Sequence, residues 1–437
     1  MPNAPSAPPP SPSLHRAIRT RHAVALYVSS VLGSGILVLP GLTAQIAGPA
    51  SLLAWALLAV ASVPFALTFA SLSARHPESG GVYGFAREAF GGTAARVTGW
   101  LFALWEFTGA PAVALIAASY LGYAFPLDRP ETFLLGFGIL VAAFAINYRG
   151  ISFSSKVQLA VIVSIIALLL GTIALSGMRV RPENFAPFLP YGLVPIGTAA
   201  ALIFWSFLGY ENVSNVAEEF EDPARDFPRA VYLSTALVGG LYFAVAFVTV
   251  GTAAYVAGGS VAPFAAILGN VLGPFGAMGT AVLAVFIIFG VVNAYTAGMS
   301  RVLYATARDG GLPRGLAHLD PVRRIPDRAL LVMIVGVGIV LTVYYFANVS
   351  LTSALLVSSG AAIAVYILGS AAGVRLRPVV GRSGRPNRWL AGISLAISIG
   401  VLPFIGPLAL VSLAVVLAAI AYAYLDRRRS GARAPGR

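Results

Sequence analysis

A glycine-containing stretch inside an apolar run is the first place where this sequence could do chemistry. Residues 31–40 read VLGSGILVLP, within an apolar run over residues 22–47. Gly33 and Gly35 weaken a helix there, because each glycine costs about 1 kcal/mol relative to alanine in a helix interior. A second half-helix that begins after such a break has free N–H groups and the positive end of its dipole, which together bind an anion such as a carboxylate.

A second weak point lies at Leu208-Gly209, within the segment FWSFLGYEN. An interrupted helix inside a membrane is tolerated only where its free backbone groups face protein or a water-filled cavity. Two interrupted helices at corresponding positions of two halves indicate a solute-binding site at the membrane midplane. The alternative is that Gly33, Gly35 and Gly209 only allow neighbouring helices to pack closely.

Two acidic residues, Glu106 and Glu211, lie within apolar stretches. No Lys, Arg or His falls deep in any predicted span, so burial favours the neutral form of both carboxyls. An ionisable group inside a membrane is a functional hypothesis by default. We expect Glu211 to act in proton coupling or gating, with a protonated carboxyl that bonds freed backbone as the alternative. For Glu106, a structural hydrogen bond and a contact with substrate or proton both stay open.

The elements that must position these residues are membrane-spanning helices. Of the 437 residues, 58% are hydrophobic and 10% are charged, whereas a soluble domain carries about 25% charged residues. The apolar blocks are long enough to cross a bilayer and lack the alternation of a membrane β-barrel. The sequence therefore predicts an all-α polytopic membrane protein. It has no cysteine and four scattered histidines, so neither a disulfide nor a metal site is expected.

We predict twelve transmembrane helices. A Pro-rich disordered tail over residues 1–15 precedes them, and a basic tail over residues 426–437 follows them. Residues 262–272 are apolar but short, so a surface or re-entrant helix is expected there. The predicted spans are 22–47, 51–73, 93–124, 131–147, 156–176, 194–219, 228–253, 276–306, 328–347, 350–374, 389–405 and 408–425.

The basic residues predict the orientation of the chain. All but three of the 29 Lys and Arg residues fall on one side when the loops alternate across the membrane, and the exceptions are Arg129, Arg179 and Arg181. Basic loops stay in the cytoplasm, so both chain ends are expected there, in a plasma (cell inner) membrane. The net charge of +13 therefore reports topology rather than binding to nucleic acid.

Three stretches resemble the amino acid–polyamine–organocation superfamily of transporters, over about residues 20–425. They are GSGI at 33–36, FWSFLGYENVSNVAEEFEDPARDFPRA at 204–230 and SRVLYATARDGGLP at 300–313. Two further stretches are similar to the branch that exports methionine and branched-chain amino acids, and they are RHPESGGV at 75–82 and RVTGWLF at 96–102.

The resemblance implies a leucine-transporter-like fold. Its core, residues 22–374, would be a 5+5 inverted repeat in which helices 1 and 6 are broken. The two halves would cover residues 22–176 and 194–374, and two peripheral spans would cover residues 389–425. The resemblance also implies that amides at the first break bind a substrate carboxylate and that carbonyls at both breaks receive its ammonium. The amides belong to Ser34, Gly35 and Ile36, and the carbonyls belong to Val31, Trp205 and Leu208.

The substrate side chain would then face Trp205, Ser206 and Tyr295, although ordinary helix packing is the alternative for Trp205 and Tyr295. Arginine-antiporting relatives place a polar amide where this chain has Ala110, which favours an apolar pocket here. Some proton-coupled relatives carry a lysine within the fifth span, whereas Lys156 of this chain lies only at the mouth of that span. A lysine-based coupling mechanism is therefore not expected.

These features predict a secondary active transporter of neutral hydrophobic amino acids such as methionine, leucine, isoleucine and valine, with proton linkage and no cofactor. A cationic amino-acid or polyamine antiporter is the alternative within the class. A membrane enzyme is disfavoured because the spans carry no metal-ligand cluster, phosphate loop or nucleophile–base pair. A channel is disfavoured because no selectivity motif repeats.

Overall fold

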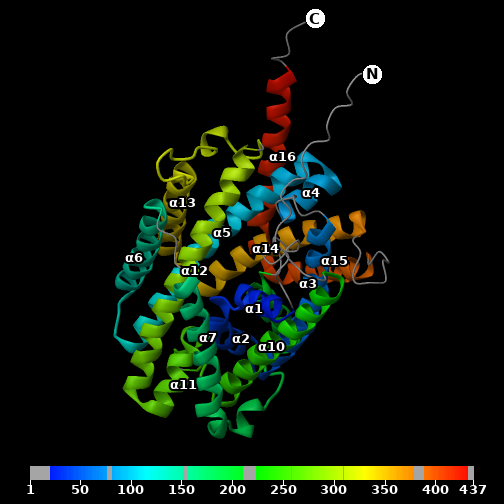
Figure 1. Ribbon diagram of the computed structural model, residues 1–437. Coiled ribbons are helices and arrows are strands. Elements are labelled where there is room, and N and C mark those ends of the chain that lie inside the picture. Colours follow the sequence, from blue (N-terminus) through cyan, green and yellow to red (C-terminus); the bar gives the residue numbers. More distant parts are fainter. Residues whose placement is uncertain are drawn as a thin grey trace, which may run out of the picture.

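The computed structural model describes residues 20–75, 81–150, 155–209, 223–256, 258–308, 310–377 and 388–431. Every regular element in these ranges is a helix (Figure 1). Helices satisfy their own backbone N–H and C=O groups, as segments in lipid must. Glu211, the predicted tail over residues 1–15 and residues 432–437 lie outside the described ranges.

The helices follow one another along the chain with short connections. The α-helices are α1 (Thr20–Val31), α2 (Gly35–Ala47), α3 (Ser51–Arg75), α4 (Val82–Phe90), α5 (Gly92–Ala124), α6 (Arg129–Tyr148), α7 (Ser155–Ser176), α8 (Val194–Ile203), α10 (Pro223–Gly251), α11 (Pro263–Leu272), α12 (Pro274–Arg308), α13 (Asp327–Phe346), α14 (Leu351–Leu376), α15 (Arg388–Val401) and α16 (Ala409–Gly431). The 3₁₀ helices are η1 (Gly48–Ala50), η2 (Gly177–Arg179), η3 (Pro182–Phe185), η4 (Phe204–Phe207), η6 (Gly259–Val261), η7 (Arg314–Leu316) and η8 (Leu402–Leu408).

Nine helical runs within the described ranges are long and apolar enough to cross a membrane. Two of them, Gly35–Ser73 and Arg388–Leu425, have 39 and 38 residues, about twice the length that one crossing needs. Each contains a 3₁₀ joint with a glycine at positive φ, which is +62° at Gly48 and +66° at Gly406. Both joints coincide with a boundary between two predicted spans, and the other seven runs follow predicted spans closely.

Three segments differ from the sequence prediction. Helix α4 was not predicted, because its nine residues are far too few to form an apolar span. Helix α11 was predicted as a surface or re-entrant helix, and its first six residues, 263–268, are buried in the protein, which disagrees with the surface alternative only. Helix α16 continues to Gly431 and so includes part of the predicted basic tail, because nothing in the sequence Asp-Arg-Arg-Arg-Ser breaks a helix.

Local sequence signals set some of the helix ends. At the start of α6, the amide of Glu131 donates to the Asp128 carboxylate, and the Asp128 amide donates to the Glu131 carboxylate, each at 2.8 Å. This reciprocal capping box satisfies two of the free donors at the helix start. At the start of α14, the Ser350 hydroxyl accepts from the Ser353 amide at 3.1 Å.

The helices pack in two groups, and contacts of α14 with α3 and α8 and of α2 with α5 join them. In the first group, α10 packs against α1, α2 and α3, while α8 packs against α2 and α3. In the second group, α5 is central and packs against α6, α12, α13 and α14. Because α1, α2 and α8 carry the helix breaks, the breaks belong to the first group and face the second.

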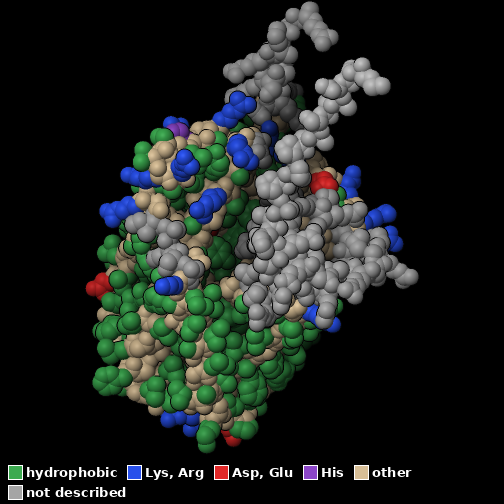
Figure 2. All heavy atoms as spheres, viewed as in Figure 1, with side chains coloured by type: hydrophobic (Ala, Val, Ile, Leu, Met, Phe, Trp, Pro, Cys, Tyr) green, Lys and Arg blue, Asp and Glu red, His purple; other side chains and the backbone are tan. Residues whose placement is uncertain are grey.

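The surface agrees with a position in a bilayer. Hydrophobic side chains cover a broad band of the molecule, while Lys and Arg side chains gather at the end that carries α4 and the end of α16 (Figures 1 and 2). A smaller basic group lies at the opposite end (Figure 2). This is the asymmetry of charge that orients membrane proteins.

Candidate functional site

The first helix break occupies the residues between α1 and α2. Helix α1 ends at Val31 and α2 begins at Gly35, so Leu32, Gly33 and Ser34 lie outside both helices. The Leu37 amide donates to the Ser34 carbonyl at 3.1 Å, which closes the first turn of α2. The amides at the very start of a helix have no partner within it, and here they are the amides of Ser34, Gly35 and Ile36. The structure therefore presents a helix N-terminus at this point in the protein interior.

The second break follows η4. After Phe207 the chain is extended at Leu208, and Gly209 has a φ of +119°. The Ser30 hydroxyl donates to the Gly209 carbonyl at 2.7 Å. A Cβ added at Gly209 would lie 2.3 Å from the Ser30 carbonyl oxygen, closer than real Cβ contacts allow. The second break therefore contacts the backbone of the last turn of α1, just before the first break, and only glycine permits this approach.

We expect Gly209→Ala to destabilise the protein by about 1–3 kcal/mol, because alanine at positive φ is strained and its Cβ meets backbone. Gly171→Ala is the matched control, since Gly171 lies inside α7 and a Cβ there would meet nothing within 4 Å. The measurement is the midpoint of thermal unfolding of each purified variant in detergent. Equal midpoints for the two variants would show that the contact with Ser30 does not constrain the chain.

A small cavity lies where the two breaks face α5 and α12. Its volume is about 30 Å³, which gives room for one or two water molecules. Most of the described residues that the sequence analysis predicted for the site line this cavity. The exceptions are Gly209 and Ile36, and the Ile36 side chain is fully buried in the core. The predicted residues that line the cavity are Val31, Gly33, Ser34, Gly35, Glu106, Ala110, Trp205, Ser206, Leu208 and Tyr295.

The Trp205 ring lies between two glycines that line the cavity, Gly35 and Gly109. A Cβ added at Gly35 would lie 2.8 Å from Cδ1 of Trp205, and a Cβ added at Gly109 would lie 2.7 Å from Cη2 at the far end of the same ring. The indole therefore spans the distance between α2 and α5, and a glycine at each end makes room for it. Trp105 meets Trp205 edge-on, with ring centroids 6.2 Å apart.

Two polar side-chain atoms at this cavity form no hydrogen bond with the described residues. They are Oε1 of Glu106 and Oγ of Ser206, and both are buried. Glu106 as a whole is only 5% exposed. Buried polar atoms almost always have partners, so these two atoms mark the cavity as a place where a polar ligand, water or proton can be received. Tyr295, in contrast, is 40% exposed and lies at the rim of the cavity.

Sequence reasoning did not single out Tyr242. Its hydroxyl, fully buried on α10, donates to the Val31 carbonyl at 2.9 Å. That carbonyl is one of those expected to receive an ammonium group. A carbonyl oxygen has two lone pairs, so the tyrosine occupies one and leaves the other. No pattern around residue 242 pointed to this contact, since it depends on how α10 packs against α1.

The cavity lining includes five more residues that the sequence analysis did not name. They are Trp105, Gly109, Val113, Val291 and Val292. A helical repeat could have found several of them, because positions three or four apart share a helix face. Gly109 and Val113 follow Trp105 at intervals of four on α5, and Val291 precedes Tyr295 by four on α12.

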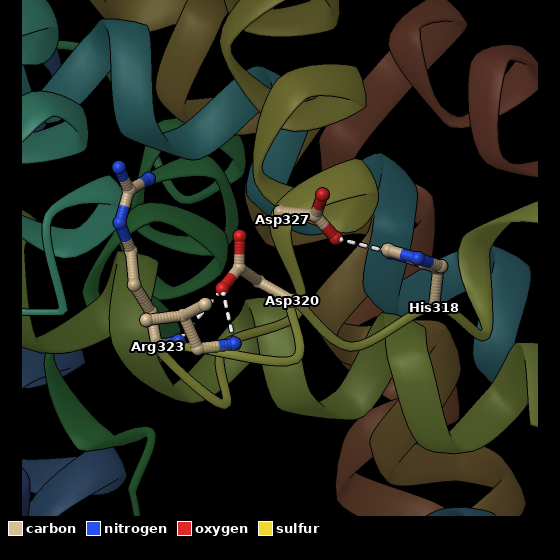
Figure 3. A network of polar contacts seen from close by, with 5 residues as sticks. His318, Asp320, Arg323 and Asp327 are labelled. Atoms are coloured by element: carbon tan, nitrogen blue, oxygen red, sulfur yellow. Dashed lines mark hydrogen bonds and ion pairs between the residues drawn. The ribbon is translucent and has the colours of Figure 1, made fainter.

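A network of polar contacts in the connection between α12 and α13 lies away from the cavity (Figure 3). Nδ1 of His318 lies 2.7 Å from Oδ1 of Asp327. The Asp320 carboxylate accepts from the amides of Val322 at 2.9 Å and Arg323 at 2.6 Å. These contacts fold the connection between α12 and α13 on itself. Within the described ranges, no three His, Cys, Asp or Glu side chains gather in a way that could hold a metal ion.

Comparison with known proteins gives one consistent picture. The family model described as "Amino acid permease" matches residues 18–425. The chain is 35% identical over 417 residues to the uncharacterized amino acid permease YecA of Bacillus subtilis, covering 95% of this chain and 97% of that protein. It is 32% identical to the L-methionine/branched-chain amino acid exporter YjeH of Escherichia coli, covering 83% and 87%. It is 30% identical to the branched-chain amino acid permease BcaP of Bacillus subtilis, covering 72% of each.

Proposed function

This chain belongs to the amino acid permease family, and we propose that it is a secondary active transporter that carries neutral, apolar amino acids across the plasma membrane. It is a transporter and not an enzyme. The observation that carries the proposal is the convergence of both helix breaks on one cavity whose other walls are mainly apolar. The names of YjeH and BcaP, which refer to methionine and branched-chain amino acids, support the same substrate class.

The proposed topology has twelve spans with both chain ends in the cytoplasm. Each of the two longest helical runs, Gly35–Ser73 and Arg388–Leu425, contributes to two spans, and α8 with η4 begins the sixth span. The first five spans and the next five form the proposed inverted repeat, and α15 and α16 are peripheral. The asymmetric charge of the two ends of the molecule supports this orientation.

In the proposed binding mode, the substrate carboxylate binds the amides of Ser34, Gly35 and Ile36. The helix dipole and the free donors at the start of α2 both favour an anion there. The substrate ammonium contacts the carbonyls of Trp205 and Leu208, together with the remaining lone pair at Val31. The side chain then faces Ala110 and the aromatic rings.

The small volume of the cavity bears on how the transporter works. About 30 Å³ is far below the roughly 300 Å³ or more of an ordinary ligand pocket, so the cavity has no room for an amino acid in this conformation. We propose that the group of α1, α2, α3, α8 and α10 rocks against the group centred on α5, and that the Trp205 ring turns to admit substrate. Alternating access in this class of fold is of this rigid-body kind.

Glu106 and Glu211 are the proposed coupling groups. The contact of Glu106 with the cavity supports its role, because its buried Oε1 forms no hydrogen bond within the described residues. The position of Glu106 at the cavity also favours a second candidate function, the transport of cationic amino acids, because its carboxylate could pair with the basic side chain of such a substrate.

A competition experiment separates the two substrate classes. We expect leucine, isoleucine, valine and methionine to displace radiolabelled leucine from the purified protein better than arginine, lysine or glutamate do. Selectivity within the apolar set should be loose, because one methylene in an apolar pocket changes affinity by about 1–3 kcal/mol. If arginine competes at a tenth of the leucine concentration, the apolar assignment is wrong, and Glu106 becomes the partner of a cationic side chain.

A further inference from the structure

A second pocket lies far from the helix breaks, where η2 and η3 connect the end of α7 to the segment before α8. It is open to the surface and has a volume of about 620 Å³. This segment is at the lower end of the molecule, near α11 (Figure 1), where Figure 2 shows the smaller basic group. Only three basic residues fall on this side of the predicted topology, and two of them, Arg179 and Arg181, line the pocket.

The backbone holds these two arginines on one side of the chain. Val180 and Arg181 are both extended, and in an extended segment residues two apart point in the same direction. Val180 itself is anchored against the end of α10, where a Cβ at Gly251 would lie 2.6 Å from its Cγ1. The Gly251 carbonyl accepts from the Arg181 amide at 2.9 Å and from Nδ2 of Asn184 at 2.7 Å.

The pocket is rich in donors and poor in negative charge. Arg179 donates one N–H to the backbone carbonyl of Asn270, so its guanidinium is fixed across the pocket towards α11 and keeps further donors. None of the described residues that line the pocket is acidic. The exposed Glu183 lies two residues after Arg181, and no ion pair joins Arg181 to a carboxylate of the described residues. Asn184, Asn270 and Thr252 add polar side chains to the lining. The guanidinium groups of two arginines that line one pocket can donate hydrogen bonds to the oxygens of a phosphate group.

The surroundings favour a lipid as the source of that phosphate. Helix α7 ends at Ser176 and α10 ends at Gly251, so the pocket lies where two membrane spans reach the interface. Met178 lines the pocket and is almost fully exposed, and Leu272, next to the lining residue Val271, is also exposed. Apolar side chains beside a basic pocket at this depth match a headgroup whose acyl chains lie alongside the protein.

We propose that this pocket binds a phosphate-bearing anion through Arg179 and Arg181, and that the headgroup of an anionic phospholipid in the non-cytoplasmic leaflet is its source. The choice of leaflet rests on the proposed topology, but the site does not depend on which solute the protein transports. It assigns a role to two arginines on the side of the membrane where positive charge is otherwise scarce.

The experiment uses the full chain, purified in detergent and stripped of lipid. Native mass spectrometry measures the binding of dioleoyl phosphatidylglycerol and of dioleoyl phosphatidylcholine to the wild type, to Arg179→Gln/Arg181→Gln and to Arg129→Gln. The last variant is the matched control, because Arg129 is the third arginine of that side but lies over Phe133 and Tyr345. We expect the double variant to lose about tenfold or more of its affinity for phosphatidylglycerol, since two charge-assisted contacts are removed.

A second arm distinguishes the sources of the anion. Inorganic phosphate is added to the lipid-free protein, and thermal stability is measured. Stabilisation of the wild type by phosphate but not of the double variant, without selective binding of phosphatidylglycerol, would support the anion site and identify a soluble phosphate as its ligand. The proposal is overturned if the double variant binds both probes as the wild type does, or if Arg129→Gln loses as much affinity as the double variant. Unfolding midpoints without added anion show whether each variant is folded.

Discussion

Gly35→Leu is expected to abolish substrate binding while the protein still reaches the membrane. A Cβ at Gly35 would already lie 2.6 Å from Oγ of Ser206 and 2.8 Å from Cδ1 of Trp205. The remaining atoms of leucine would fill a cavity of about 30 Å³ and cover the amides at the start of α2. Both effects act at the proposed carboxylate site. The measurement is the affinity for leucine by scintillation proximity or calorimetry on purified protein.

Gly33, two residues before Gly35, provides a matched control for this test. A Cβ at Gly33 would meet only the Val31 carbonyl oxygen, at 3.8 Å, which is ordinary contact. We expect Gly33→Ala to bind within about twofold of the wild type, and Gly35→Ala to lose about tenfold, because overpacking costs about 1–3 kcal/mol. Leucine binding that stays near the wild-type level in both Gly35 variants would refute the assignment of the amides at α2 to the carboxylate.

The sequence predicts the long apolar helices well, because each is one continuous run of residues. A bilayer demands an uninterrupted apolar helix, so length and composition suffice to find α5, α12 or α14. The sequence analysis misses α4, because a nine-residue amphipathic helix leaves no such run. Gly33, Gly35 and Gly209 indicate where a helix is easily interrupted. The contact of Ser30 with Gly209 could not be predicted, because it depends on how two segments far apart in the sequence pack.

The candidate site is harder to predict than the spans, because it depends on which way each side chain points. Glu106 and Ala110 are four residues apart on α5, so a common face could be anticipated, and both line the cavity. The orientation of the Trp205 ring could not be anticipated, since it is set by glycines on two other segments, at 35 and 109. The contact of Tyr242 with Val31 likewise needs the packing of α10 against α1.

Glu106→Gln is expected to remove most of the ability of a pH gradient to drive accumulation of substrate, while binding and exchange survive. In this conformation the carboxyl is buried at the cavity and its Oε1 has no partner among the described residues. A buried carboxyl at the cavity can bind a proton in one conformation of the transporter and release it in another. Opening the cavity to water allows the proton to leave. Glutamine keeps the shape of the side chain but cannot carry the proton.

The measurement is uptake of radiolabelled leucine into proteoliposomes with an imposed pH gradient, compared with exchange at equal pH. One proton moving down a gradient of about one pH unit can support about a tenfold concentration ratio, so the loss in Glu106→Gln should approach that factor. Glu211→Gln is assayed beside it, because Glu211 is the second acid predicted inside a span. If Glu106→Gln keeps the full gradient-driven accumulation and Glu211→Gln loses it, Glu211 carries the proton. Glu106 then has a structural role in the cavity or contacts the substrate. If both variants keep it, transport is not linked to protons through either acid.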